Sequence, residues 1–158
     1  MKRTVLALVF VLLAGGIAHA AGGDPLPAPT KKKKDAPQTS PELTYNEGLV
    51  LVQKGEWVEA EEKFRHAIKL NPRLPEAWNE LGHTLKMQRK FDEAVAAYKE
   101  ALRLRPKYPQ ALEYLGEAYV QMGKIDEAKA VLAQLQPLDE GHAEVLARVI
   151  QTGRDPGW

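Results

Sequence analysis

A pattern of apolar and small residues recurs in this chain at an interval of 34 positions. The clearest copy is residues 75–108, PEAWNELGHTLKMQRKFDEAVAAYKEALRLRPKY. The positions of this copy that recur 34 residues earlier are Gly82 (as Gly48), Phe91 (as Trp57), Ala94 (as Ala60), Tyr98 (as Phe64) and Pro106 (as Pro72). A third copy continues the register 34 residues later with Gly116, Ile125, Ala128 and Leu132. A fixed period of this length predicts an array of stacked units.

Each copy has the spacing of two amphipathic helices. In residues 75–108, apolar and small side chains follow one another in steps of three and four, first from Trp78 to Leu85 and then from Phe91 to Leu102. Such steps place them on one face of an α-helix. The turn 88–90 separates the two helices, and Pro106 ends the second because proline lacks the backbone N–H that a helix interior needs.

The period, with its W-x-x-L-G, A-x-x-x-Y, A-L and proline positions, resembles the tetratricopeptide repeat (TPR) family. The resemblance covers residues 41–152 and implies an all-α, right-handed α-solenoid of three TPR helix pairs plus a C-terminal capping helix. We expect the repeats at 41–74, 75–108 and 109–142 and the capping helix at about 139–152. Ser40 and Asp139 are the expected N-caps, and Gly153 is the expected terminator of the last helix.

The segments outside the repeats have other compositions. Residues 1–20 combine a basic start, an apolar run and an Ala18-His19-Ala20 site, which is the layout of a secretory signal peptide. The alternative is an uncleaved anchor, although the apolar run is shorter than the roughly 20 residues that span a bilayer. We expect residues 21–40, rich in proline and lysine, to form a disordered linker, and residues 153–158 a frayed tail.

The linker contains a run of four basic residues, Lys31, Lys32, Lys33 and Lys34. One interpretation is a weak electrostatic tether to an anionic surface. The other is a solvated run that keeps the segment extended. With no stable membrane insertion expected, we predict an exported, soluble protein that is periplasmic or secreted.

Composition excludes several classes of function. The chain has no cysteine, Ser40 is its only serine, and its formal net charge is +1. Thiolate chemistry is excluded, serine catalysis has almost no candidate, and no basic field indicates nucleic acid. Glu80 and His83 have the Glu-x-x-His spacing of carboxylate metal sites, but only one copy exists. We therefore expect no catalytic residues, no metal and no cofactor.

The resemblance implies that the first helix of each pair lines a concave groove that holds a peptide or protein segment. The candidate partner-binding residues are Tyr45, Asn46, Leu49, Asn79, Glu80, His83, Met87, Glu113, Tyr114, Glu117 and Gln121. Where co-chaperone members of the family carry a basic clamp for acidic tails, this sequence has Tyr45, Leu49, Glu80, Gln110 and Tyr114. We therefore expect a neutral or basic partner segment. The alternative is that these residues are solvated and the repeats serve only as a spacer.

We consequently predict an exported, non-enzymatic adaptor that binds a protein partner, as an accessory of a cell-envelope assembly. The envelope role follows from fold resemblance alone. The alternatives are a self-associating structural subunit or spacer of a larger complex, and a metal-binding protein or enzyme.

Overall fold

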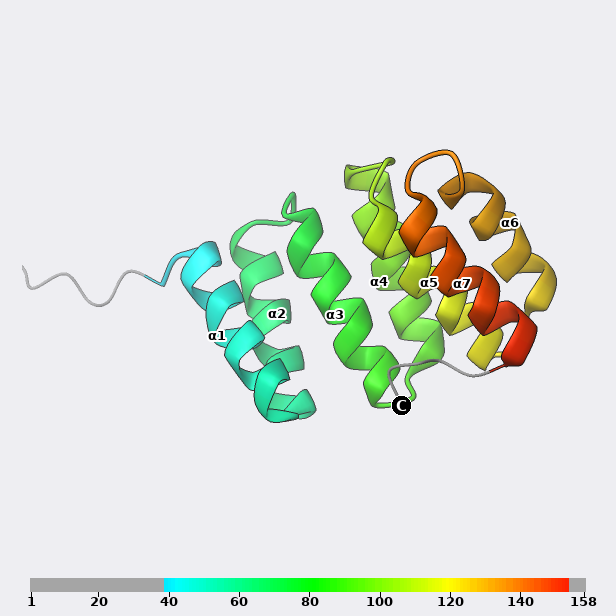
Figure 1. The fold of residues 1–158 in the computed structure, drawn as a ribbon. Coiled ribbons are helices and arrows are strands. Elements are labelled where there is room, and N and C mark those ends of the chain that lie inside the picture. The colour runs from blue at the N-terminus through cyan, green and yellow to red at the C-terminus, as the bar shows by residue number, and fades with distance from the viewer. Residues whose placement is uncertain (1–38, 154–158) are drawn as a thin grey trace, which may run out of the picture. The chain divides into compact units, whose positions relative to one another are not determined.

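The computed structural model describes residues 39–153, and this part of the chain contains seven α-helices and no strand (Figure 1). The helices are α1 (Pro41–Lys54), α2 (Trp57–Leu70), α3 (Pro75–Met87), α4 (Phe91–Leu104), α5 (Pro109–Gln121), α6 (Ile125–Leu135) and α7 (Glu140–Thr152). The predicted all-α solenoid of helix pairs is confirmed. The predicted signal peptide, most of the linker with its four lysines, and the tail after residue 153 lie outside the described residues.

Local chemistry fixes the helix ends. Ser40 Oγ accepts a hydrogen bond from the Leu43 N–H at 3.0 Å, and Asp139 Oδ1 accepts one from the His142 N–H at 3.0 Å. Both side chains therefore satisfy a donor that a helix start leaves unpaired, as N-caps do. Gly153 ends α7 with a φ of 66°, a left-handed conformation that glycine adopts without steric cost.

The recurring glycines let the helices approach closely. A Cβ on Gly82 would lie 2.6 Å from Tyr98 Cε1, and one on Gly48 would lie 2.7 Å from Phe64 Cε1. In the first two pairs, therefore, the glycine of the first helix receives the aromatic ring of the second. This contact explains why glycine and aromatic residue recur together.

In the third pair, the space above the glycine is filled by a side chain from a helix outside the pair. Leu132 stands where the first two pairs have their rings, and it is only half-buried. The space above Gly116 is instead filled by Leu146 of α7, whose Cδ2 lies 2.5 Å from a Cβ built on that glycine. Leu146 is fully buried. The last helix thus completes the core of the third pair and does more than cover its end.

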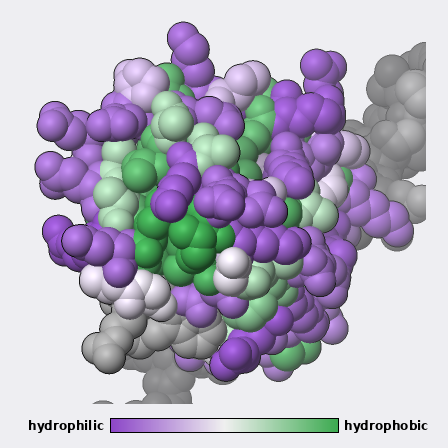
Figure 2. All heavy atoms as spheres, turned by 90° about the vertical axis from the view of Figure 1, so that its right-hand side faces the viewer, coloured by the Kyte–Doolittle hydropathy of each residue, from purple (hydrophilic) through white to green (hydrophobic). Residues whose placement is uncertain are grey.

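The helices α1 to α6 pack in sequence order, each on the next, and α7 packs on both α5 and α6 (Figure 1). Figure 2 views the α6–α7 end and shows an apolar area ringed by hydrophilic side chains. A hollow of about 260 Å³ at this end is lined by Leu132, Gln136, Glu140, Ala143, Glu144 and Ala147.

Candidate functional site

The predicted site residues lie on α1, α3 and α5, the first helices of the three pairs, which contact one another in that order. Most of these side chains are partly accessible. We call the inner face the surface made by exposed Asn46 and half-buried Tyr45, Leu49, Glu80, His83, Met87, Glu113, Tyr114 and Gln121.

Two of the predicted site residues are not accessible in the described part of the chain. Asn79 has 0% of its surface exposed and Glu117 has 2%. Glu117 Oε2 accepts a hydrogen bond from Lys86 Nζ at 2.6 Å, and the Lys86 side chain is buried as well. The expectation that Asn79 and Glu117 face an open groove was therefore wrong. The ion pair joins α3 to α5 in the packed layer below the inner face.

A carboxylate that has no countercharge among the described residues lies on the inner face near three tyrosines. Glu80 is half-buried, and within residues 39–153 its hydrogen-bond partner is the neutral amide of Asn79, whose Nδ2 donates to Glu80 Oε1 at 3.2 Å. Burial raises the pKa of Glu80, and the hydrogen bond from Asn79 lowers it by less. Asn79 Oδ1 is itself buried and accepts no hydrogen bond within the described residues. We call Tyr45, Asn79, Glu80, Tyr108 and Tyr114 the Glu80 cluster.

The pKa values of the tyrosines in the Glu80 cluster are raised by burial and by the charge of Glu80. Burial, followed by the charge of Glu80, raises the pKa of Tyr45 to about 12 and that of Tyr108 to about 12. Burial also raises the pKa of Tyr114, and the charge of Glu80 adds to that rise. All three side chains are therefore neutral phenols at pH 7, each with a hydroxyl and a ring near a negative charge.

The cations nearest to the cluster are already paired. Arg105 forms an ion pair with Glu76, and its guanidinium lies over the Tyr108 ring, 4.6 Å from the centroid. Lys86 pairs with Glu117, and its Nζ lies 5.1 Å from the centroid of the Tyr114 ring. Two rings of the cluster therefore already face a cation whose charge a different carboxylate balances.

Aromatic contacts continue along the inner face beyond the cluster. The His83 imidazole stacks on the Tyr114 ring with centroids 5.2 Å apart, and the Trp57 ring meets His83 edge-on at 6.0 Å. His83 is therefore held by ring packing between α2 and α5. Glu113 Oε2 lies 3.8 Å from His142 Nε2, which links this face to α7.

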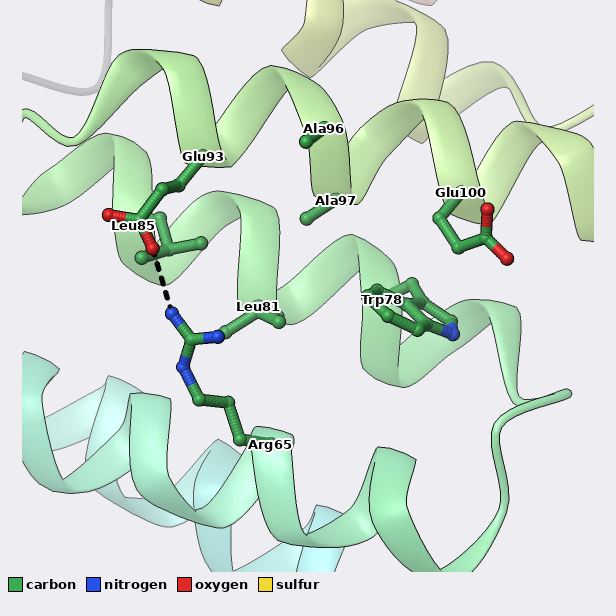
Figure 3. A pocket seen from close by; sticks show the side chains of 8 residues that line it. All are labelled: Arg65, Trp78, Leu81, Leu85, Glu93, Ala96, Ala97 and Glu100. Carbon is green, nitrogen blue, oxygen red and sulfur yellow. Dashed lines mark hydrogen bonds and ion pairs between the residues drawn. The ribbon is translucent and has the colours of Figure 1, made fainter.

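A second candidate site, missed by the sequence reasoning, lies between the second helices α2 and α4 (Figure 3). This outer pocket encloses about 330 Å³ and is lined by Arg65, Trp78, Leu81, Leu85, Glu93, Ala96, Ala97 and Glu100. Trp78 Nε1 donates to the Pro72 carbonyl at 2.9 Å, which fixes the ring at one end. Ala96 and Ala97, adjacent on α4, have side chains too small to fill this space. This pair of alanines was the sequence feature from which the pocket could have been predicted.

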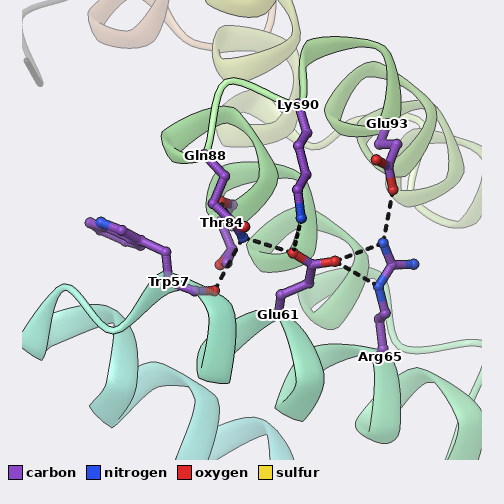
Figure 4. A network of polar contacts seen from close by, with 7 residues as sticks. All are labelled: Trp57, Glu61, Arg65, Thr84, Gln88, Lys90 and Glu93. Atoms are coloured by element: carbon purple, nitrogen blue, oxygen red, sulfur yellow. Dashed lines mark hydrogen bonds and ion pairs between the residues drawn. The ribbon is translucent and has the colours of Figure 1, made fainter.

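The wall of the outer pocket belongs to a network of ion pairs around Glu61 (Figure 4). The Glu61 carboxylate accepts hydrogen bonds from Gln88 Nε2 at 2.7 Å, Lys90 Nζ at 2.9 Å and Arg65 Nη2 at 2.9 Å. Burial opposes ionisation of Glu61, but the bonds from Lys90, Gln88 and Arg65 outweigh it and hold the pKa below its ordinary value. Arg65 also pairs with Glu93 across the pocket at 2.9 Å.

Between residues 39 and 153, no group of three or more histidine, aspartate or glutamate side chains could hold a metal ion. Within that range, no helix combines the length and the apolar character needed to cross a bilayer.

Comparison with known sequences identifies the repeats. A profile described as "Tetratricopeptide repeat" matches residues 85–148, and one described as "TPR repeat" matches residues 48–89. The comparison with curated proteins gave no match.

Solved structures share the fold at low sequence identity. The first TPR of Spaghetti (RPAP3), solved bound to the HSP90 peptide SRMEEVD, superposes with a TM-score of 0.67 at 20% identity, covering 71% of this chain and 90% of that one. The Yersinia enterocolitica type III secretion chaperone SycD, solved with a peptide of the translocator YopD, gives 0.65 at 19% identity, with 70% and 91% covered. The TPR domain of Arabidopsis OM64 gives 0.68 at 19% identity, with 73% and 97% covered. These likenesses concern the fold.

Proposed function

Residues 48–148 carry tetratricopeptide repeats, and from that premise we propose that the protein is a non-enzymatic adaptor that binds a segment of a partner protein on its inner face. The observation that carries this proposal is the Glu80 cluster, where a carboxylate without a countercharge and three phenols are gathered on one surface. Two proteins of similar fold were solved with a peptide bound.

The proposed partner segment is neutral or basic. The peptide in the Spaghetti structure, SRMEEVD, is acidic, and such a ligand needs basic residues in its site. Here the inner face presents Glu80 and Glu113, and Lys86 of α3 is buried against Glu117. An acidic segment would meet like charge on this surface.

Site-directed photocrosslinking tests the proposed function. A photoreactive phenylalanine analogue replaces Asn46 or Gln121 on the inner face, or Glu62 or Lys99 on the second helices as controls. The protein is irradiated in its native host, and the captured products are identified by mass spectrometry. We expect one partner to be captured from both inner positions and from neither control position. Equal capture from all four positions would contradict the proposal.

Export and a role as an accessory of a cell-envelope assembly belong to the same proposal. They rest on the composition of residues 1–20 and on the fold resemblance. Fractionation of the native host, with mass spectrometry of the N-terminus, tests export. A periplasmic or secreted protein that begins at Ala21 is expected. A cytoplasmic protein that keeps Met1 would contradict this part of the proposal.

The tether through Lys31, Lys32, Lys33 and Lys34 remains a prediction. Flotation with anionic and neutral vesicles tests it, because weak binding that salt abolishes should occur with the anionic vesicles alone. Binding to both kinds of vesicle, or to neither, would contradict an electrostatic tether.

Self-association through the ends of the solenoid is the second candidate function. Leu43 and Val50 of α1 are 48% and 49% exposed, and the hollow at the α6–α7 end has both apolar and polar lining residues. Exposed apolar area of this kind can mark a contact surface. Light scattering of the purified protein distinguishes the two functions, since a monomer at micromolar concentration would exclude self-association.

A further inference from the structure

Glu80 differs from Glu76 and Glu117 in that no cation among the described residues lies beside it. Within residues 39–153, Glu76 pairs with Arg105, Glu117 pairs with Lys86, and Glu113 lies 3.8 Å from a His142 nitrogen. Glu80 has only the Asn79 amide. A half-buried carboxylate loses part of its hydration, and nothing within the described residues returns the lost charge stabilisation.

A second polar group beside Glu80 also lacks a partner. Asn79 is fully buried, and its Nδ2 is used by Glu80, so the amide orientation is set. Its Oδ1 is left without a donor in the described part of the chain. Glu80 therefore offers a partly accessible charged acceptor with one neutral donor, whereas the neutral acceptor Asn79 Oδ1 is buried. A group that carries N–H donors and a positive charge would supply the countercharge and the further donors that Glu80 lacks within the described residues.

Two of the three rings of the Glu80 cluster already have a cation of the described residues over them, and the Tyr45 ring has none. Tyr108 and Tyr114 already hold a cation over their rings, namely Arg105 at 4.6 Å and Lys86 at 5.1 Å. Those cations are committed to Glu76 and Glu117, so neither balances Glu80. The negative side of an aromatic ring favours a cation, and the hydroxyls of the tyrosines add polar contacts at the rim.

We propose that the Glu80 cluster is a subsite for one lysine or arginine side chain of the partner segment, with Glu80 as its countercharge. This inference rests on the proposed function and sharpens it. It attributes the selection of a basic over a neutral partner segment to one residue, Glu80. An acidic or purely apolar side chain would leave Glu80 unbalanced.

NMR titration of the full-length chain tests the subsite with three peptides, Ac-Gly-Lys-Gly-NH2, Ac-Gly-Nle-Gly-NH2 and Ac-Gly-Glu-Gly-NH2. Norleucine keeps the aliphatic length of lysine and lacks its charge. We expect the lysine peptide to bind the wild-type chain roughly tenfold or more tightly than the norleucine peptide, because a charge-assisted hydrogen bond forms only with lysine. Shifts should concentrate on α1, α3 and the start of α5. Equal binding of the lysine and norleucine peptides would overturn the subsite.

Two variants assign the preference to Glu80. Glu80→Gln should lose the preference for lysine, whereas the matched control Glu62→Gln, an exposed residue of α2, should keep it. Circular dichroism checks that both variants stay folded. Tyr108→Phe, which keeps the ring and removes the hydroxyl, should weaken lysine binding by less than Glu80→Gln. If Glu80→Gln retains the lysine preference, the assignment is overturned.

A further variant tests whether the chain fills the subsite with its own lysines. Replacing Lys31, Lys32, Lys33 and Lys34 by serine should leave the affinity for the lysine peptide unchanged. A tighter complex would overturn the assignment of the subsite to a partner. Failure of the subsite is distinguishable from failure of the proposed function: with the lysine preference absent and the inner-face crosslinks retained, only the subsite falls, whereas loss of those crosslinks contradicts the function itself.

Discussion

Glu61 and Glu80 are glutamates on adjacent helices whose surroundings drive their pKa values in opposite directions. Glu61, on the outer side, accepts hydrogen bonds from Lys90, Gln88 and Arg65, and its pKa is lowered (Figure 4). Glu80, on the inner side, has one neutral donor, and burial raises its pKa. Burial opposes ionisation of both carboxylates, and only around Glu61 do the hydrogen bonds from partners outweigh it.

This difference separates a charge that serves the fold from one that is available to a ligand. The Glu61 network joins α2 to the turn between α3 and α4 through Gln88 and Lys90, so these bonds are made once the helices have packed. The hydrogen bond of Glu80 within the described residues is to Asn79, on its own helix. A carboxylate that costs stability and is balanced by nothing internal is the kind of group found at binding sites. The predictions below test this contrast, from the largest effect to the smallest.

The largest loss of stability is expected from breaking the buried ion pair of Lys86 and Glu117. Glu117→Gln removes the negative charge that Lys86 Nζ meets at 2.6 Å in a buried site, and we expect a loss of about 3–5 kcal/mol in the free energy of unfolding. Urea denaturation measures it. As a control, the double variant Lys86→Met with Glu117→Leu should regain much of the loss, because no buried charge remains. A neutral effect of Glu117→Gln would contradict the buried pairing.

Removing the outer charge should destabilise the protein by less. Glu61→Gln weakens bonds from partners that are partly exposed, and we expect a loss of about 1–2 kcal/mol. The folded pKa of Glu61 is lowered, so its contribution is present above the unfolded pKa and is lost as pH falls through the folded value. The difference between wild type and variant should therefore shrink in acid. A difference that stays constant with pH would show that charge is not the cause.

Removing the charge of Glu80 should stabilise the protein rather than destabilise it. The folded pKa of Glu80 is raised, so ionising it costs more in the folded state than in the unfolded state. Its favourable contribution is present below the unfolded pKa and is lost as pH rises through the folded value. We expect Glu80→Gln to gain about 0.5 kcal/mol at pH 7, within the usual range for a residue that is not fully buried. Thermal unfolding at pH 7 measures whether Glu80→Gln raises or lowers the stability. A lower stability would contradict the proposed difference between Glu80 and Glu61.

The smallest expected effect is on the tyrosines. The pKa values of Tyr45 and Tyr108 are raised to about 12 from the ordinary 10.0, mainly by burial and secondly by the charge of Glu80. Glu80→Gln should lower both values only in part, because burial remains. Ultraviolet absorbance titration measures the change, with circular dichroism confirming that the helices persist. A complete return to the ordinary value would assign the whole shift to charge.

The sequence was sufficient to predict features that depend on local spacing. The register of Gly48 with Phe64 and of Gly82 with Tyr98 predicted the helix pairs, and the caps at Ser40 and Asp139 followed from residue type. Features that depend on two helices at once were missed. Asn79 and Glu117 occupy positions that a single helix would expose, and Lys86, on the neighbouring helix, covers and neutralises Glu117. The periodicity of one helix carries no information about that partner.

The direct test of the contrast is the carboxyl pKa of Glu80 and of Glu61, measured by NMR in one sample of the isotope-labelled chain, with and without Ac-Gly-Lys-Gly-NH2. The account predicts that Glu80 titrates above the ordinary glutamate value and Glu61 below it. It also predicts that the lysine peptide lowers the pKa of Glu80 and leaves that of Glu61 unchanged. A Glu80 pKa that is already below the ordinary value in the free protein, or that the peptide does not move, would contradict it.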